Sequence, residues 1–183
     1  MSEIESKRVN YDHEDQANLI RNISFFLTES QSSKIEPPEF NQNLEERDWK
    51  VLVENFYSYK GQWIKGTDIR EGYGIQIHYD GSKYEGFFKN NHFEGHGNYI
   101  TNENIYDGTF KKSKLHGEGI HVSQTGITYI GQFKKGLRQG IGKYSTVEGY
   151  FYDGEWANDL ENGKGKLTIR DVSSYQGQFR KGK

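Results

Sequence analysis

Cysteine is absent from the 183-residue chain, which excludes a disulfide framework and every thiolate metal site and fits a reducing compartment. Long apolar runs are also missing, since no stretch approaches the roughly 20 apolar residues of a membrane span. The first residues lack the apolar core of a signal peptide, and their carboxylates argue against an organellar presequence. We therefore expect a soluble, cytoplasmic protein.

Aliphatic residues and proline are scarce. The hydrophobic content is 32%, aromatic residues at 15% of the chain supply nearly half of it, and 22 glycines stand against 2 prolines. Disordered chains are poor in aromatic residues, so we expect a folded sheet of rings packed on bare backbone. The net charge is −2, and residues 51–183 are only mildly basic. This balance does not indicate a nucleic-acid partner.

The chain does contain a repeated pentad, Tyr-x-Gly-x-aromatic. Its six copies begin at Tyr59, Tyr84, Tyr106, Tyr129, Tyr152 and Tyr175. Spacings of 25, 22, 23, 23 and 23 residues identify an internal repeat. A Gly-x-Gly follows each of the first five copies, at Gly72/Gly74, Gly95/Gly97, Gly117/Gly119, Gly140/Gly142 and Gly163/Gly165. The period predicts one two-stranded unit per repeat.

Each pentad predicts a β-strand whose Tyr, Gly and second aromatic share one face, because side chains alternate along a strand. Glycine weakens a strand, so its regular return predicts the close approach of a ring to bare backbone. Asp80-Gly81, Thr125-Gly126 and Glu148-Gly149 suit tight turns between repeats. Within a repeat we expect a loop of about six residues, such as 111–116. The apolar residues expected to anchor these loops are Ile69, Phe93, Leu115, Leu137 and Leu160.

The fold class that follows is all-β, an elongated single-layer antiparallel β-meander built as a solenoid, with a short helical or disordered N-terminal tail. A solenoid needs an atypical unit over its first repeat. The segment from Trp49 to Tyr57 has both strand and helix periodicity, and we expect a capping strand there. Residues 49–183 then hold the cap, five full repeats and one half repeat.

Residues 1–48 are expected to form a tail outside the repeats. Residues 1–16 are polar and charged, as in disordered segments. An apolar face at helical spacing then predicts a short amphipathic helix. That face consists of Leu19, Ile20, Ile23, Phe26 and Leu27. Pro37-Pro38 denies a helix its hydrogen bonds and predicts a linker. The helix either packs on the chain's own repeats or docks on another protein.

The combination of Tyr-x-Gly-x-Phe, a Lys-rich turn and Gly-x-Gly resembles the MORN repeat from Tyr59 to Lys183. The resemblance implies an elongated, twisted single-layer sheet with an aromatic groove, used as a scaffold or attachment module. Similar repeats in radial-spoke and other ciliary proteins imply a cytoskeleton-associated place in a cilium or flagellum axoneme. The groove that the resemblance implies is lined by Tyr84, Phe88, Tyr106, Phe110, Tyr129, Phe133, Tyr152 and Trp156.

Catalytic and cofactor chemistry is not expected. Gly-x-Gly lacks the third glycine and the following helix of a dinucleotide site, and Gly142-Lys143 has Leu137 where a P-loop needs glycine. His92 and His96 lack both the helical spacing of a zinc-protease motif and a third ligand. No nucleophile elbow is present, and a single-layer sheet offers no deep water-excluding pocket. We expect a non-enzyme without metal or cofactor.

Two functional classes remain open. The first is a protein-interaction scaffold, an assembly subunit that binds partners through the aromatic groove and the N-terminal helix. The second is a membrane-surface tether that binds anionic phospholipids through basic loops. The candidate lipid contacts are Lys111, Lys112, Lys114, Lys134, Lys135 and Arg138. No Gly-x-Gly follows the pentad at residues 175–179, so we expect a partner or a second copy, end to end, to cover that strand, the alternative being a solvated edge that frays.

Overall fold

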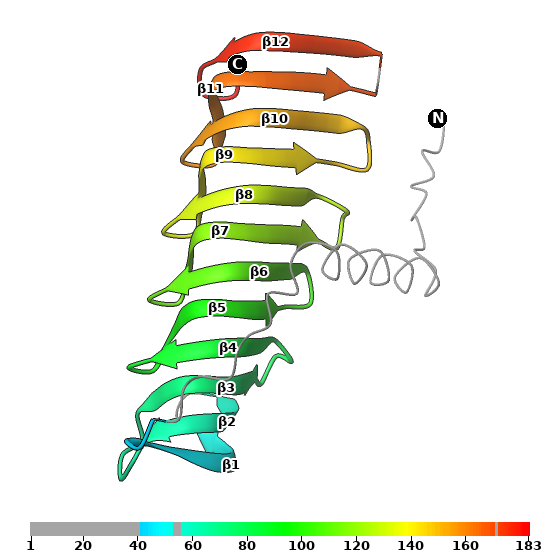
Figure 1. Ribbon diagram of the computed structural model, residues 1–183. Coiled ribbons are helices and arrows are strands. Elements are labelled where there is room, and N and C mark those ends of the chain that lie inside the picture. Colours follow the sequence, from blue (N-terminus) through cyan, green and yellow to red (C-terminus); the bar gives the residue numbers. More distant parts are fainter. Residues whose placement is uncertain (1–40, 53–55, 171) are drawn as a thin grey trace, which may run out of the picture. The chain divides into compact units, whose positions relative to one another are not determined.

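The computed structural model of the protein describes residues 41–52, 56–170 and 172–183, which form a single open sheet of twelve strands (Figure 1). In chain order the strands are β1 (Leu44–Leu52), β2 (Tyr57–Ile64), β3 (Arg70–His78), β4 (Lys83–Lys89), β5 (His92–Ile100), β6 (Asn104–Lys111), β7 (Lys114–Ser123), β8 (Thr128–Lys134), β9 (Leu137–Ser145), β10 (Tyr150–Ala157), β11 (Leu160–Ile169) and β12 (Ser173–Phe179). Each strand is antiparallel to the next, and spatial order follows chain order. The predicted all-β, single-layer meander is confirmed.

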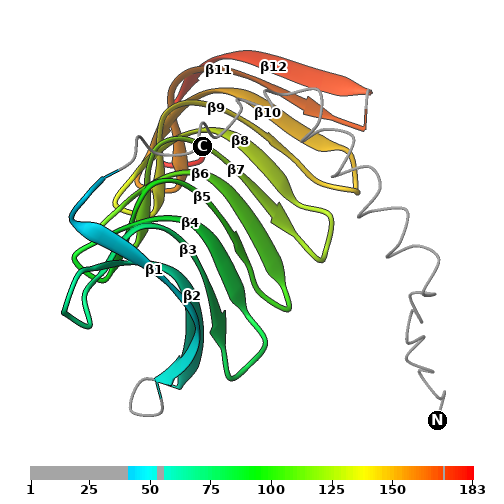
Figure 2. The same cartoon turned by 60° about the horizontal axis from the view of Figure 1, so that its bottom comes forward.

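The sheet is one layer thick, and its strands curve together (Figure 2). Inter-strand spacings of about 4.8 Å make the twelve-stranded sheet about 53 Å long. This length exceeds that of any of its strands, whose ten residues at most span about 33 Å. Among the described residues, no helix is long and apolar enough to cross a membrane.

The two faces of the sheet differ as the alternation predicts. In β4, Tyr84, Gly86 and Phe88 are buried, whereas Lys83 and Glu85 are half-exposed. The pentads in β2, β8 and β10 have the same pattern. We call the face that carries the pentad tyrosines the ring face and the opposite one the outer face.

Glycines form a continuous row across the sheet from β2 to β12. The glycine of each pentad pairs with the second glycine of the neighbouring Gly-x-Gly strands, as Gly86 does with Gly74 and Gly97. The tyrosine folds over this row, and the Tyr84 hydroxyl donates to the Phe87 carbonyl at 3.0 Å. A Cβ atom at Gly97 would overlap that hydroxyl. The close approach of ring to backbone therefore requires glycine.

The strands bend toward the ring face at the glycine row. In β2, the ring centroids of Tyr59 and Trp63 are 5.0 Å apart, although four residues of a straight strand span about 13 Å. A β-bulge lies between Gly61 and Trp63, and bulges bend strands. The rings therefore fill the inside of the bend and form the core.

The turns within the repeats are shorter than the sequence predicts. Lys111 pairs directly with Lys114, so a two-residue turn joins β6 to β7. Lys112 and Ser113 have φ values of 49° and 60°, as in a type I′ turn, whose twist matches that of the flanking strands. The loop predicted over 111–116 is wrong, because β7 begins at the turn and not at Gly-x-Gly.

Both edges of the sheet are tied from one repeat to the next. At the edge of the within-repeat turns, the Ser113 amide donates to the Phe93 carbonyl at 2.9 Å, and the Gly136 amide donates to the Leu115 carbonyl at 2.8 Å. At the other edge, the Gln124 amide donates to the Glu103 carbonyl at 2.7 Å, and the Arg170 amide donates to the Gly149 carbonyl at 2.7 Å. Gly81, Gly126 and Gly149 have positive φ in these turns between repeats, as predicted. The turns are thus fixed relative to their neighbours.

β1 caps the first repeat. It pairs antiparallel with β2 and begins at Leu44, inside the range 1–48 that the sequence analysis assigns to the tail. The Arg47 guanidinium lies 5.1 Å from the centre of the Trp63 ring. β1 is therefore the atypical end unit that a solenoid needs.

Candidate functional site

The eight residues predicted to line an aromatic groove all lie on the ring face, and seven of them are buried. These seven are Tyr84, Phe88, Phe110, Tyr129, Phe133, Tyr152 and Trp156. Their rings pack edge to face, as Tyr84 does on Phe110 with centroids 5.3 Å apart, a geometry that aromatic pairs prefer. The protein uses these side chains as its own core, and their role in partner binding stays a prediction.

Each buried pentad tyrosine has one hydrogen bond for its hydroxyl. Tyr129 donates to the Gln132 carbonyl at 2.9 Å, and Tyr152 donates to the Glu155 carbonyl at 2.9 Å. Burial raises the pKa of Tyr129 and that of Tyr152 to about 12. These hydroxyls therefore stay protonated and act as structural donors.

Tyr106 is the exception. Its ring stacks on His121, with centroids 4.7 Å apart and planes 9° apart, and its centroid lies 6.3 Å from that of Tyr99. The other five pentad tyrosines donate to the carbonyl three residues on, but Tyr106 makes no such bond within the described part of the chain. Phe133 lies over Gly119 in its place. The ring of Tyr106 is consequently half-exposed.

Tyr106 belongs to a set of half-buried rings on the ring face, which we call the Tyr/His row. Its members are Tyr57, His78, Tyr99, Tyr106, His121, Tyr144 and Tyr150. The five members from Tyr57 to His121 pack ring against ring, as Tyr57 and His78 do with centroids 5.8 Å apart, and Tyr144 packs on Tyr150. Each ring offers an apolar body and a polar tip, a combination enriched at protein interfaces. The row is the accessible aromatic surface of this face.

The row is uncharged near neutral pH. Burial lowers the pKa of His78 and of His121 and raises the pKa of Tyr106. The Nε2 atom of His121 lies 2.8 Å from Asn104 Oδ1, so Nε2 donates and the imidazole is held in one tautomer. The row therefore offers apolar contacts and neutral hydrogen-bonding groups to a partner.

Sequence reasoning found only Tyr106 of this row. Tyr99, His121 and Tyr144 each stand two residues after the second glycine of a Gly-x-Gly. Alternation places that position on the same face as the pentad tyrosine. This spacing could have identified the row in the sequence. The position is occupied by Tyr, His, Gln or Leu in different repeats, so it does not stand out as a conserved aromatic position within the chain.

Arg138 is engaged inside the ring face. Its guanidinium lies 4.3 Å from the centre of the Trp156 ring, and its Nε atom donates to Asp159 Oδ1 at 3.2 Å. Leu137, predicted to anchor the turn, is instead 41% exposed. The inward position stands two residues before the Gly-x-Gly, where Arg138 pairs with Phe133 as Leu115 pairs with Phe110, and Leu137 stands one residue too early. As a candidate lipid contact, Arg138 therefore has a guanidinium that is already paired.

The equivalent position in the first repeat is Arg70. It is buried, its guanidinium lies 4.7 Å from the centre of the Tyr57 ring, and it donates to the Asn91 carbonyl at 2.7 Å. The predicted anchor Ile69 precedes it and is only half-buried. Phe93 and Leu115 do point inward, as predicted.

The other five candidate lipid contacts lie on two neighbouring turns at one edge of the sheet. They are Lys111, Lys112, Lys114, Lys134 and Lys135, which we call the turn lysines. All five are exposed. The structure thus brings them together, and their contact with lipid stays a prediction.

The histidines considered for metal binding lie apart from any ligand set. His96 is 3.6 Å from Asp107 Oδ1 on the outer face, and His92 is exposed beside a turn. Over the described residues, no three His, Asp or Glu side chains are grouped to hold a metal ion.

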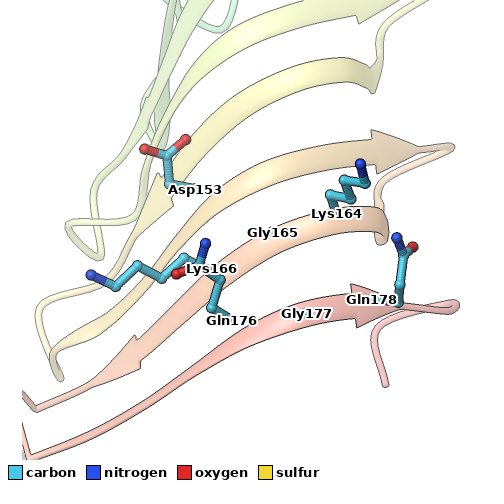
Figure 3. Close-up of a pocket in the computed structure, with 7 residues that line it drawn as sticks. All are labelled: Asp153, Lys164, Gly165, Lys166, Gln176, Gly177 and Gln178. Atoms are coloured by element: carbon cyan, nitrogen blue, oxygen red, sulfur yellow. The ribbon is translucent and has the colours of Figure 1, made fainter.

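An open hollow of about 710 Å³ lies on the outer face over β10, β11 and β12 (Figure 3). Asp153, Lys166 and Gln176 lie on one side of it, and Lys164 and Gln178 on the other. Its lining is polar and open to solvent. A hollow of this kind does not exclude water, as most catalytic pockets do.

The predicted docking helix falls outside the described residues. Its apolar positions are Leu19, Ile20, Ile23, Phe26 and Leu27. Whether this segment docks on a partner stays a prediction.

The family model of the MORN repeat matches the chain six times. The matched ranges are 59–83, 84–102, 106–128, 129–149, 152–171 and 175–183. Together they cover more than half of the sequence. No curated protein matches the chain.

Proposed function

Because the chain belongs to the MORN-repeat family, we propose that it is a non-enzymatic scaffold, an assembly subunit that binds protein partners on its ring face. Repeats of this family take part in interactions with proteins or membrane lipids. The observation that carries the proposal is the Tyr/His row, a half-exposed aromatic surface that runs ring against ring from Tyr57 to His121 beside the buried core.

The location of the row supports protein binding. It lies on the inside of the bend, where a segment of a partner can contact several strands at once. Aromatic side chains anchored in a rigid sheet lose little conformational freedom on binding, so they contribute strongly to interfaces. The contact surface that we propose is therefore the Tyr/His row, and not the buried pentad rings that the sequence analysis assigned to a groove.

Non-enzymatic function is part of the proposal. The buried tyrosines have raised pKa values because of burial and serve as structural donors. The described hollow on the outer face is open and polar. These features support a binding role and supply no activated nucleophile or general base.

The proposal is tested by co-purification of partners with substituted chains. Tyr106→Ala and His121→Ala should each reduce partner recovery, because each removes a half-exposed ring from the row. Tyr79→Ala is the matched control, since Tyr79 is 91% exposed in a turn between repeats and outside the row. Equal recovery with all three variants would contradict the proposal.

We further propose a cytoskeletal setting, in a cilium or flagellum axoneme, on the strength of the resemblance to ciliary MORN-repeat proteins. A fluorescent fusion of the full chain should follow the axoneme of a ciliated cell and resist detergent extraction. A signal that is diffuse and fully extracted would remove this part of the proposal and leave the scaffold role standing.

A membrane-surface tether is the second candidate. It is favoured by the five exposed turn lysines, because clustered cations attract anionic lipid. Wild-type protein that fails to sediment with phosphoinositide vesicles at low salt would exclude it.

An end-to-end contact at β12 remains a prediction about partners. Tyr175 is 52% exposed, whereas the equivalent Tyr152 is fully buried with Phe179 of the next pentad 4.9 Å away, centroid to centroid. A strand added beyond β12 would cover Tyr175 in the same way. Amides of residues 175–179 should then exchange slowly in the assembly and quickly in the dilute chain, and quick exchange in both would rule the contact out.

A further inference from the structure

Lys111 and Lys114 face each other directly across the turn that joins β6 to β7. Like charges at directly opposite positions destabilise an antiparallel pair. Lys112 lies in the turn between them, and Lys134 and Lys135 occupy the same edge one repeat later. The five lysine side chains thus repel one another and do not contribute to the packing of the sheet.

The carboxylates near this edge have other partners. Glu94 accepts a hydrogen bond from the backbone amide of Lys112 at 3.0 Å, and Glu118 accepts one from a side-chain amide on β8. Asp159 pairs with Arg138. No ion pair formed by the described residues includes a turn lysine. The described part of the chain therefore leaves these five charges uncompensated.

The spacing of the two lysine turns is fixed. Two backbone hydrogen bonds, from the Ser113 amide to the Phe93 carbonyl and from the Gly136 amide to the Leu115 carbonyl, tie each turn to the preceding repeat. Two strands at about 4.8 Å place successive turns about 9.6 Å apart. Three residues of an extended chain span about 10 Å. An extended peptide lying along this edge therefore matches the lysine spacing at every third residue.

The turn between β10 and β11 differs in charge. It consists of Asn158 and Asp159, both with positive φ, and it carries no lysine. The densest cationic stretch is therefore confined to two successive turns, preceded at the same edge by the single exposed Lys89. A segment of about six extended residues covers the two turns.

We propose that the turn lysines bind an extended acidic segment of a partner protein, with carboxylates at about every third residue. This proposal rests on the scaffold function and names the chemistry of one partner. A flat anionic membrane fits this edge less well, because Glu94, which is bonded to the backbone of Lys112, would approach it together with the lysines. A peptide directs its carboxylates to the lysines alone.

Binding of a fluorescein-labelled Asp/Glu hexapeptide to the full chain tests the proposal, with an Asn/Gln hexapeptide for comparison. The variant K111Q/K112Q/K114Q should raise the Kd for the acidic peptide about tenfold, as expected for the loss of three exposed charge contacts. K143Q/K164Q/K166Q is the matched control, because it removes the same charge from exposed lysines on the outer face and should leave the Kd unchanged. Added salt should weaken binding to the wild type.

Thermal unfolding gives an independent readout. Without peptide, Lys114→Gln should raise the Tm, because it relieves the repulsion with Lys111, whereas Lys164→Gln should not. With peptide, the Tm of the wild type should rise with peptide concentration.

Three results would overturn the proposal. They are equal Kd values for the triple variant and its control, binding of phosphatidylserine and phosphoinositide vesicles without binding of the peptide, and binding of neither. Tyr106 is on the ring face and is not one of the turn lysines. The co-purification experiment with Tyr106→Ala therefore tests the scaffold role separately from the binding of an acidic segment.

Discussion

The third and fourth repeats contain the same pentad, yet they use its tyrosine differently. Tyr129 lies over the glycine row, is fully buried and donates its hydroxyl to Gln132. Tyr106 leaves that position, stacks on His121 and stays half-exposed. The position after the turn differs as well, with Arg138 in one repeat and Leu115 in the other.

The comparison separates the two tasks of the pentad. Where the hydroxyl is bonded to the backbone, the ring stabilises the bend and has no surface left for a partner. Where the ring is turned out, it adds to the Tyr/His row. The proposed binding surface is therefore centred on the repeat that departs from the pattern.

The largest expected contrast concerns the glycine row. A Cβ atom at Gly142 would overlap the Tyr129 hydroxyl, whereas at Gly119 its closest contact would be the Asp107 carbonyl at 3.1 Å. Gly142→Ala should therefore lower the free energy of unfolding by about 3 kcal/mol and Gly119→Ala by about 1 kcal/mol. Urea unfolding measures both, and equal losses would show that Tyr106 also occupies the glycine row.

The position after the turn gives the next contrast. Arg138→Met keeps the length of the side chain and removes both the contact of the cation with Trp156 and the bond to Asp159. It should lower the free energy of unfolding by about 2 kcal/mol. Lys143→Met on the same strand is the control, since Lys143 is exposed, and it should change stability little. An Arg138→Met variant as stable as the wild type would contradict the structural role of the guanidinium.

Removing single hydroxyls tests the comparison more finely. Tyr129→Phe breaks the bond to the Gln132 carbonyl and should cost about 1 kcal/mol. Tyr106→Phe should be close to neutral, because its hydroxyl has no such bond among the described residues. Chemical unfolding of both variants measures the two losses. An equal loss of unfolding free energy in Tyr106→Phe would show that the Tyr106 hydroxyl also donates to a backbone carbonyl.

The smallest effect is the pH dependence from His121. Burial lowers its pKa below the ordinary value of 6.5, so the unfolded chain binds the proton more tightly than the folded one. The stabilisation is therefore complete above about pH 6.5 and is lost as pH falls through the lowered folded pKa. His121→Gln should reduce the dependence of the unfolding free energy on pH below about pH 6.5. If the dependence is unchanged, it comes from other groups, His78 included.

Most of the fold could be predicted from the sequence because it depends on local period. The pentad fixes which residues share a face, and the glycine spacing fixes the register of neighbouring strands, so twelve strands and their order followed. The turn length could not be predicted in this way. Ser and Lys at positive φ are locally disfavoured, and the turns that contain them are also tied to the preceding repeat, which is a tertiary effect.

The candidate site was only partly predictable for the same reason. The pentad rings were assigned to a groove, but filling the inside of a bend buries them, and the bend itself comes from bulges that the sequence pattern does not mark. The turned-out ring of Tyr106 depends on Phe133 lying over Gly119, a contact between repeats. The inward arginine occupies the position that Leu115 has one repeat earlier, and an apolar residue beside it, Leu137, was taken for the anchor instead.

The central claim is that partners contact the ring face around Tyr106. Its most direct test is site-specific photo-crosslinking with benzoylphenylalanine at position 106, in the full chain expressed in its native cell. The control position is Ile141, which is 56% exposed on the outer face. We expect a discrete crosslinked partner from position 106 and none from position 141. Crosslinking from position 141 alone, or from neither position, would contradict it.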